Sequence, residues 1–156
     1  MRERTGKRFE MAENAEAAVR AADIIVTATT SPKPLFNSEW VSEGVHINAI
    51  GSNSLARQEV AEAVLRRSTL ICVDTRETAV REAGDLLPLL EKGRTHSGRW
   101  VELGELINGQ RTGRTRATDL TVFESQGLAV QDLALAVRLE ARARARGLGV
   151  ELPYGG

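Results

Sequence analysis

Short apolar runs rich in β-branched residues alternate with stretches of helical character, and this alternation constrains the fold more than any other feature. Three of the four runs are almost continuously apolar, which is typical of strands buried on both faces of a parallel sheet. The connections between the runs exceed a dozen residues, so they favour parallel pairing through right-handed crossovers. The sequence therefore predicts an α/β fold with strands at residues 22–29, 45–50, 69–73 and 120–123.

The intervening stretches carry helix start and stop signals. Asn14 suits an N-cap for a helix that ends near Ala22, and Thr75 suits one for a helix that ends before Gly84. Residues 87–116 are the least regular part and are expected to hold one short helix near 102–107. Two further helices are predicted from helical spacing of apolar residues, one over residues 55–67 and a long one over 126–146 that stops at Gly147.

Charge and cysteine content exclude several classes of protein. The chain has 156 residues with 21 Lys and Arg against 21 Asp and Glu, so no summed positive field attracts nucleic acid or an anionic membrane. No apolar run approaches the roughly 18 residues of a spanning helix. The single cysteine, Cys72, lies in an apolar run, so we expect a reduced core thiol in a cytoplasmic protein. A single cysteine excludes a disulfide within the chain and a zinc site built from cysteines. His46 and His96 lie far apart in the sequence, so no metal site is predicted from them.

Small and polar residues follow each of the four predicted strands. In an open parallel sheet, ligands bind beyond the carboxyl ends of the strands, so these loops predict a nucleotide-facing rim. Turns and helix caps need the same residue types, so the pattern alone leaves a purely structural interpretation open. The four loops are residues 27–32, 48–54, 74–77 and 124–127.

No Gly-x-Gly-x-x-Gly motif occurs in the sequence, so the pyrophosphate-binding turn of a dinucleotide fold is missing. Taken alone, the acids of the segment 82–85 are expected to be solvated at a helix end. Trp40 and Trp100 are expected to fill the core or to cover loops. Sequence reasoning assigns no catalytic residue.

The chain resembles the ornithine cyclodeaminase and mu-crystallin family, because nine sequence blocks follow the family's pattern in the family's order. No single block is diagnostic, but together they extend over nearly all of residues 10–149. The blocks are Ala-Asp-Ile-Ile-Val-Thr-Ala-Thr-Thr-Ser (22–31), Glu-Trp-Val (39–41), Gly-Val-His-Ile-Asn-Ala-Ile-Gly-Ser-Asn (44–53), Arg-Gln-Glu (57–59), Val-Asp (73–74), Glu-Ala-Gly-Asp (82–85), Glu-Leu-Gly-Glu-Leu (102–106), Gly-Arg (113–114) and Thr-Val-Phe-Glu-Ser-Gln-Gly-Leu-Ala-Val-Gln-Asp (121–132).

The resemblance implies a Rossmann-type domain that binds NAD or NADP. It places Thr27 and Thr29 on the nicotinamide side of the cofactor, and Asn48, Ile50 and Gly51 behind it. Ser125 and Gly127 would approach the cofactor from the far edge.

The resemblance also implies a pocket for a small amino or imino acid, with Glu82 and Asn53 as substrate-binding residues. In family members that deaminate ornithine, an aspartate stands where this chain has Asn53. An amide cannot act as a carboxylate base, so reduction of a cyclic imine or amino-acid dehydrogenation fits better than ornithine cyclodeamination. A family lysine is replaced by Glu124, which either weakens an anionic contact at the rim or faces solvent.

The match covers only the family's C-terminal half. We therefore expect a partial, doubly wound Rossmann-type domain over residues 1–125 that lacks the glycine loop, and a C-terminal helix and tail over 126–156. Such a chain is expected to be catalytically incomplete and to self-associate or to pair with a complementary N-terminal half. Two alternatives stay open: a non-enzymatic nucleotide-binding or partner-dependent module, and an inactive gene fragment in which Met1 is an internal methionine.

Overall fold

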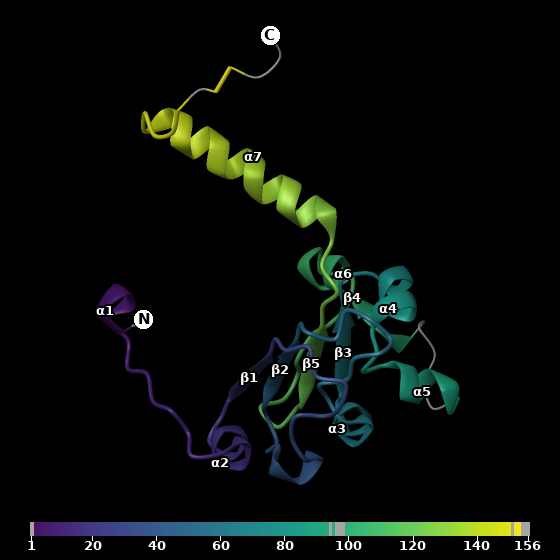
Figure 1. The fold of residues 1–156 in the computed structure, drawn as a ribbon. Helices are drawn as coiled ribbons and strands as arrows, with labels where there is room; N and C mark the ends of the chain where they lie inside the picture. The colour runs from purple at the N-terminus through teal and green to yellow at the C-terminus, as the bar shows by residue number, and fades with distance from the viewer. Residues whose placement is uncertain (1, 94, 96–98, 151, 154–156) are drawn as a thin grey trace. The chain divides into compact units, whose positions relative to one another are not determined.

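The computed structural model describes residues 2–93, 95, 99–150 and 152–153 (Figure 1). It divides into two compact units, Met1–Gln126 and Gly127–Gly156. His96 lies outside the described residues. Within the described ranges, no helix combines the length and the apolar character needed to cross a membrane.

Helices and strands alternate along the chain as the sequence predicts. The elements are α1 (Arg2–Thr5), α2 (Ala15–Arg20), β1 (Ile24–Thr27), the 3-10 helix η1 (Ser38–Trp40), β2 (His46–Ala49), α3 (Glu62–Arg67), β3 (Leu70–Val73), α4 (Arg76–Glu82), α5 (Leu87–Glu91), β4 (Val101–Glu102), α6 (Leu103–Ile107), β5 (Thr121–Glu124) and α7 (Ala129–Ala145).

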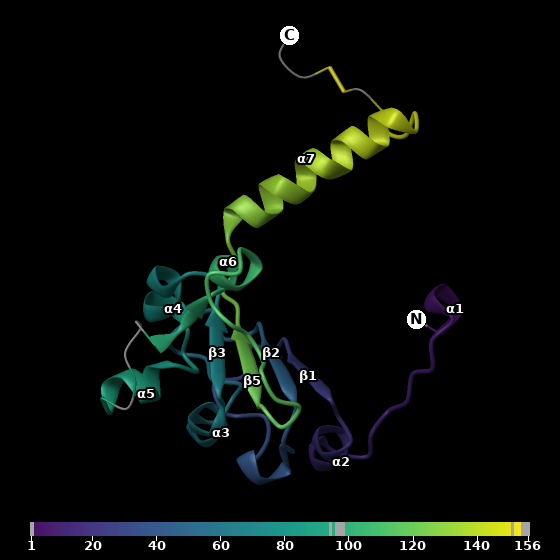
Figure 2. The same ribbon diagram turned by 180° about the vertical axis from the view of Figure 1, so that it is seen from behind.

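The strands form one parallel sheet in the order β1-β2-β5-β3-β4 (Figures 1 and 2). β5, the last strand in sequence, inserts between β2 and β3 and brings residues 121–124 to the centre of the sheet. Because all strands run the same way, their carboxyl ends and the loops that follow lie along one edge. The predicted α/β class with a parallel sheet is confirmed.

One face of the sheet carries the hydrophobic core. Ile25, Ile47 and Val122 are aligned by the strand register on this face and are buried. They belong to the same core cluster as Val19 of α2 and Val64 of α3. Trp100 is buried in this cluster and Trp40 packs against it, as expected for both tryptophans.

The opposite face of β1 is open within the first unit. Ile24 and Val26 are 63% and 60% exposed, although they alternate with buried residues on the same strand. The expectation that this strand is buried on both faces is therefore wrong within the first unit, because no other element among its described residues covers this side of β1. β1 is also an edge strand, so one row of its backbone groups has no neighbouring strand in the described sheet.

The predicted helix starts are confirmed at Asn14 and Thr75, where the capping side chain bonds a backbone N–H three residues ahead. Asn14 Oδ1 accepts a hydrogen bond from Ala17 N at 2.9 Å, and Thr75 Oγ1 accepts one from Thr78 N at 3.2 Å. The predicted start of the helix over residues 55–67 is wrong, since α3 begins only at Glu62. Residues 58–60 instead use their N–H groups for distant partners, Ser31 O and Asp85 Oδ1.

Two elements of the irregular region are absent from the sequence-based description. α5 begins with Pro88 in its first turn, and β4 has only two residues, too few for a detectable pattern. The short helix expected near residues 102–107 is confirmed as α6, with a capping box between Glu102 and Glu105. The predicted long helix is confirmed as α7 and ends before Gly147, which has φ +62°.

In the second unit, α7 is a 17-residue helix with apolar and charged side chains on its surface. Glu140 and Arg144 form an ion pair one turn apart, at 2.7 Å. The large apolar side chains of the helix are more than half exposed: Val130, Leu133, Leu135, Val137 and Leu139.

Candidate functional site

The loops after β1, β2 and β5 continue side by side beyond the strands. Ile50 N donates to Thr27 O at 3.0 Å, and Ser125 N donates to Ala49 O at 2.9 Å. These bonds extend the parallel ladder by one step past the last strand residues. We call the edge formed by Thr27, Thr29, Ile50, Gly51 and Ser125 the strand-end rim.

Gly51 lies where two chain segments are too close for a side chain. A Cβ atom at this position would overlap the carbonyl oxygen and the amide nitrogen of Thr29 and would meet Glu59 Oε2 at 2.5 Å. The absence of a side chain at Gly51 therefore lets the loops after β1 and β2 touch.

The buried side chain of Glu59 links these two loops. Its Oε1 accepts a short hydrogen bond from Thr29 N, and its Oε2 accepts one from Gly51 N at 2.9 Å. The side chain is fully buried. Sequence reasoning missed Glu59 as a site residue, although it belongs to the Arg-Gln-Glu block at 57–59, because its partners lie 8 and 30 residues away.

Two further buried acids stand next to Glu59. Asp85 Oδ1 accepts hydrogen bonds from Glu59 N at 2.6 Å and Val60 N at 3.0 Å. Burial raises the pKa of Asp85 to about 6, against the lowering effect of these two bonds. The expectation that the acids of segment 82–85 are solvated is thus wrong for Asp85 and holds for the exposed Glu82.

Glu124, the last residue of β5, is the third buried acid. Its side chain has 0% exposure, so the interpretation that it faces solvent is wrong. Burial raises the pKa of Glu124 well above its ordinary range, and the nearby negative charges of Asp85 and Glu59 raise it further. Gln126 Nε2 donates to Glu124 Oε1 at 3.2 Å.

Asp74 organises the far end of the rim. Its Oδ2 accepts hydrogen bonds from Ser125 Oγ at 2.7 Å and from Gln126 N at 3.0 Å, so the start of the β5 loop is tied to the end of β3. Ser125 is half-buried at this point. Gly127 begins the second unit and has φ +80°, a conformation that favours glycine.

The structure places Thr27 and Asn48 on opposite faces of the sheet. Thr27 pairs in register with Ala49 on the core face, and its buried Oγ1 has no hydrogen-bond partner in the described chain. Asn48 shares the other face with His46, whose Nε2 lies 3.3 Å from Asn48 Oδ1. Thr27 therefore contributes its backbone to the rim, whereas Asn48 lines a hollow of about 410 Å³ together with His46 and Phe123.

Asn53 lies in the loop after β2, and Glu82 is the last residue of α4. A β-bridge joins Asn53 to Ala83, the residue after Glu82. At Gly84, an added Cβ would overlap the carbonyl oxygen of Arg57 and lie 2.6 Å from that of Ser54. The two predicted substrate residues are thus neighbours in space, and both side chains are exposed, with Asn53 Oδ1 accepting from Arg57 Nη1 at 2.6 Å.

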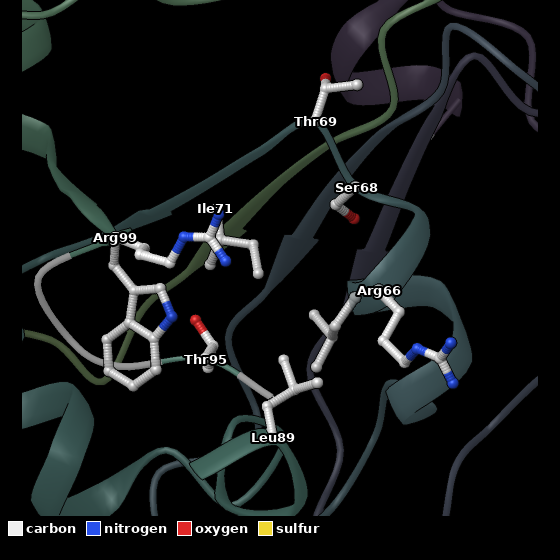
Figure 3. Close-up of a pocket in the computed structure, with 9 residues that line it drawn as sticks. Arg66, Ser68, Thr69, Ile71, Leu89, Thr95 and Arg99 are labelled. Carbon is white, nitrogen blue, oxygen red and sulfur yellow. The ribbon is translucent and has the colours of Figure 1, made fainter. Parts of the chain in front are cut away.

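A larger hollow of about 590 Å³ opens at the other end of the sheet (Figure 3). Ser68 and Thr69 line it immediately before β3, so it lies at the amino ends of the strands. Figure 3 shows Arg99 and Arg66 on opposite sides of this hollow and Thr95 beside Leu89. It contains none of the predicted site residues.

Comparisons with known proteins agree with these features. The model of the ornithine cyclodeaminase/mu-crystallin family matches residues 2–147. A Delta(1)-pyrroline-2-carboxylate reductase of Bacillus cereus is 38% identical over 155 residues, which are 99% of this chain and 47% of that protein. Ketimine reductase mu-crystallin of Mus musculus is 38% identical over 121 residues, 78% of this chain and 36% of that protein.

Solved structures show the same fold. The Thermococcus litoralis Delta(1)-pyrroline-2-carboxylate reductase in complex with NADH and L-proline aligns with a TM-score of 0.88 and 30% identity, over 97% of this chain and 47% of that one. An archaeal alanine dehydrogenase dimer with bound NAD aligns at 0.80 and 35% identity, over 92% and 44%. The chain spans about half the length of the curated relatives it matches. The chain thus belongs to the ornithine cyclodeaminase/mu-crystallin family.

Proposed function

We propose that the chain is the C-terminal part of an NAD(P)-dependent member of this family, and that the strand-end rim forms the nicotinamide side of its cofactor site. The observation that carries the proposal is the clamp of Glu59 on Thr29 N and Gly51 N, which fixes two loops at the carboxyl ends of parallel strands. Ligands bind at this edge in open α/β sheets. The alignment with relatives solved with NADH and NAD over the same segment supports it.

The residues present fit the nicotinamide half of such a cofactor. Thr29 and Ile50 are exposed at the rim, Gly51 has no side chain, and Ser125 is half-buried at the far edge. A bound nicotinamide cofactor would supply or accept the hydride. The chain would supply the orientation of the ring through the fixed loops, and Ile50 would offer an apolar contact to one ring face.

The same residues do not provide for the pyrophosphate. The sequence has no Gly-x-Gly-x-x-Gly turn, which holds this group in dinucleotide-binding folds. We infer that a complementary N-terminal half with such a turn completes the functional unit, because a second copy of this chain would lack the turn too. The exposed Ile24 and Val26 on the edge strand β1 support such a partner, because this side of the sheet is uncovered.

For the substrate, we propose a small amino or imino acid, with reduction of a cyclic imine or amino-acid dehydrogenation as the reaction. Asn53 is bridged to Ala83, the residue after Glu82 at the end of α4, and both Asn53 and Glu82 are exposed. Asn53 cannot serve as a carboxylate base, so ornithine cyclodeamination is not part of the proposal. The cytoplasmic location predicted from the buried free Cys72 belongs to the same proposal.

The direct test is an assay of NADH- or NADPH-dependent reduction of pyrroline-2-carboxylate, in which the loss of cofactor absorbance measures turnover. We expect no turnover by the purified chain alone and turnover when an N-terminal half that carries the glycine loop is added. Robust turnover by the chain alone would contradict its catalytic incompleteness. No turnover by the mixture, with micromolar NADPH binding by the isolated chain in calorimetry, would instead support the binding-module alternative.

A further inference from the structure

Three carboxyl side chains, those of Glu59, Asp85 and Glu124, lie together in the interior directly under the strand-end rim. All three have 0% exposure. We call them the acid cluster. Three negative charges cannot stay together in a buried site without a large free-energy cost, so protons or cations must compensate them.

Two of the three carboxyl groups, those of Glu59 and Asp85, accept hydrogen bonds from backbone N–H groups. Glu59 accepts from Thr29 N and Gly51 N, and Asp85 Oδ1 accepts from Glu59 N and Val60 N. N–H groups stabilise the charged form of a carboxylate, so both side chains are held as acceptors. Asp85 is further bound at its own N–H by Ser52 Oγ, at 3.0 Å.

The remaining oxygens lack donors. Asp85 Oδ2 and Glu124 Oε2 are both buried and have no hydrogen-bond partner in the described chain. The two side chains are close enough that each affects the pKa of the other. A single proton shared between them would satisfy both atoms. Glu124 is the better donor, because Asp85 accepts two backbone N–H groups and Glu124 Oε1 accepts from Gln126 Nε2.

In the part of the chain that the structure describes, no basic side chain is a main cause of the pKa shift of Glu124 or of Asp85. The charged groups that act most on Glu124 are Asp85 and Glu59, and the neutral Gln126 donates to it. Among the described residues, no group of three metal-ligating side chains is arranged to hold a metal ion.

We propose that Glu124 carries a proton at neutral pH and donates it to Asp85, and that this acid pair is a positioning device for Glu59 and, through Glu59, for the rim backbone at Thr29 and Gly51. Asp85 holds the backbone of Glu59 in place, and the Glu59 carboxylate holds the two loops. The proton on Glu124 is inferred from the acid cluster alone. The effect of this proton on cofactor binding rests on the proposed function.

The sign of the pH dependence follows from the raised pKa of Glu124 and of Asp85. The folded chain holds protons that the unfolded chain releases, so this contribution to stability is complete below the ordinary carboxyl pKa. It is lost as the pH rises through the higher pKa values of the folded chain. Above them, Asp85 and Glu124 are both charged and repel each other beneath the rim, so the backbone of Glu59 is expected to be held less firmly.

The experiment is an NMR pH titration of the full chain without cofactor. Carbon-13 labels report the Glu124 side-chain carboxyl, and nitrogen-15 labels report the amides of Thr29 and Gly51. We expect Glu124 to stay protonated through neutral pH and the two amides to shift together with its titration at higher pH. The Glu124→Gln variant keeps a neutral donor, so it is expected to fold and to remove this shared step. Glu77→Gln, at an exposed glutamate paired with Arg81 in α4, is the matched control and is expected to retain it.

The proposal is overturned if Glu124 titrates at the ordinary value of a glutamate. It is equally overturned if the amides of Thr29 and Gly51 ignore the titration, if Glu124→Gln keeps the shared step, or if Glu124→Gln fails to fold. A second arm measures NADH affinity at two pH values in the mixture with an N-terminal half. Weaker binding at the higher pH in wild type but not in Glu124→Gln supports the link to the rim. Absence of NADH binding at either pH contradicts the proposed function and leaves the result of the NMR arm standing.

Discussion

At the scale of single residues, the rim depends on the absence of a side chain at Gly51. The residue is not among the glycines with positive φ, so conformational freedom does not explain the glycine. The reason is the contact with the backbone of Thr29, which leaves no room for a Cβ atom. A side chain here would push apart the two loops that Glu59 joins.

Gly51→Ala is therefore expected to destabilise the chain by about 1–3 kcal/mol, the usual cost of forcing extra atoms into a packed site. Urea unfolding followed by circular dichroism measures the change. The matched control is Gly104→Ala in α6, where an added Cβ meets open space and alanine favours the helix by about 0.5–1 kcal/mol. Equal stability changes in the two variants would contradict the close approach at Gly51.

Several site residues could not be predicted from the sequence for a physical reason. Asn14 and Thr75 cap helices through residues three positions ahead, so their roles are visible in a short window. Glu59 and Asp85 bind backbone groups 8 to 30 residues away, and Glu124 is buried by other segments, which local patterns do not encode. The resemblance to the family marked the blocks that contain them but gave no roles to Glu59 and Asp85.

At the scale of elements, β1 combines two environments in four residues. Ile25 points into the core and Ile24 points to the uncovered face. The apolar run 22–29 predicted the strand correctly, because β-branched residues fit extended backbone. It could not predict that one face stays open, since burial depends on which other elements cover the strand.

The two faces of β1 should respond differently to truncation. Ile25→Ala is expected to cost about 2–5 kcal/mol, whereas Ile24→Ala should cost less than about 1 kcal/mol, because Ile24 is already 63% exposed. Thermal unfolding of the two variants measures the difference. A larger loss from Ile24→Ala than from Ile25→Ala would mean that the open face is covered in solution.

At the scale of the whole molecule, the exposed apolar side chains of β1 and of α7 support the proposed association with a partner. Single exposed apolar residues are common on protein surfaces, but groups of them on one element mark interaction surfaces. The chain covers 47% of the pyrroline-2-carboxylate reductases that it matches.

We accordingly expect the purified chain to self-associate. Sedimentation velocity should show larger species as the protein concentration rises. Replacement of Ile24 and Val26 together by aspartate should shift the chain toward the monomer, because charges on this face oppose its burial. The control is a double aspartate substitution at the exposed, uncharged positions Ser42 and Thr112, which adds the same two charges and should leave the association unchanged. Monomeric wild-type protein at high concentration would contradict this expectation.

The central claim is that the strand-end rim, and not the hollow at the amino ends of the strands, faces a nicotinamide cofactor. The most direct measurement is an NMR titration of the nitrogen-15-labelled chain with millimolar NADH, in which the amide chemical shifts are recorded. We expect the largest shifts at Thr29, Ile50 and Gly51 and small ones at Ser68 and Thr69. Shifts centred on Ser68 and Thr69, or no response at the rim, would contradict it.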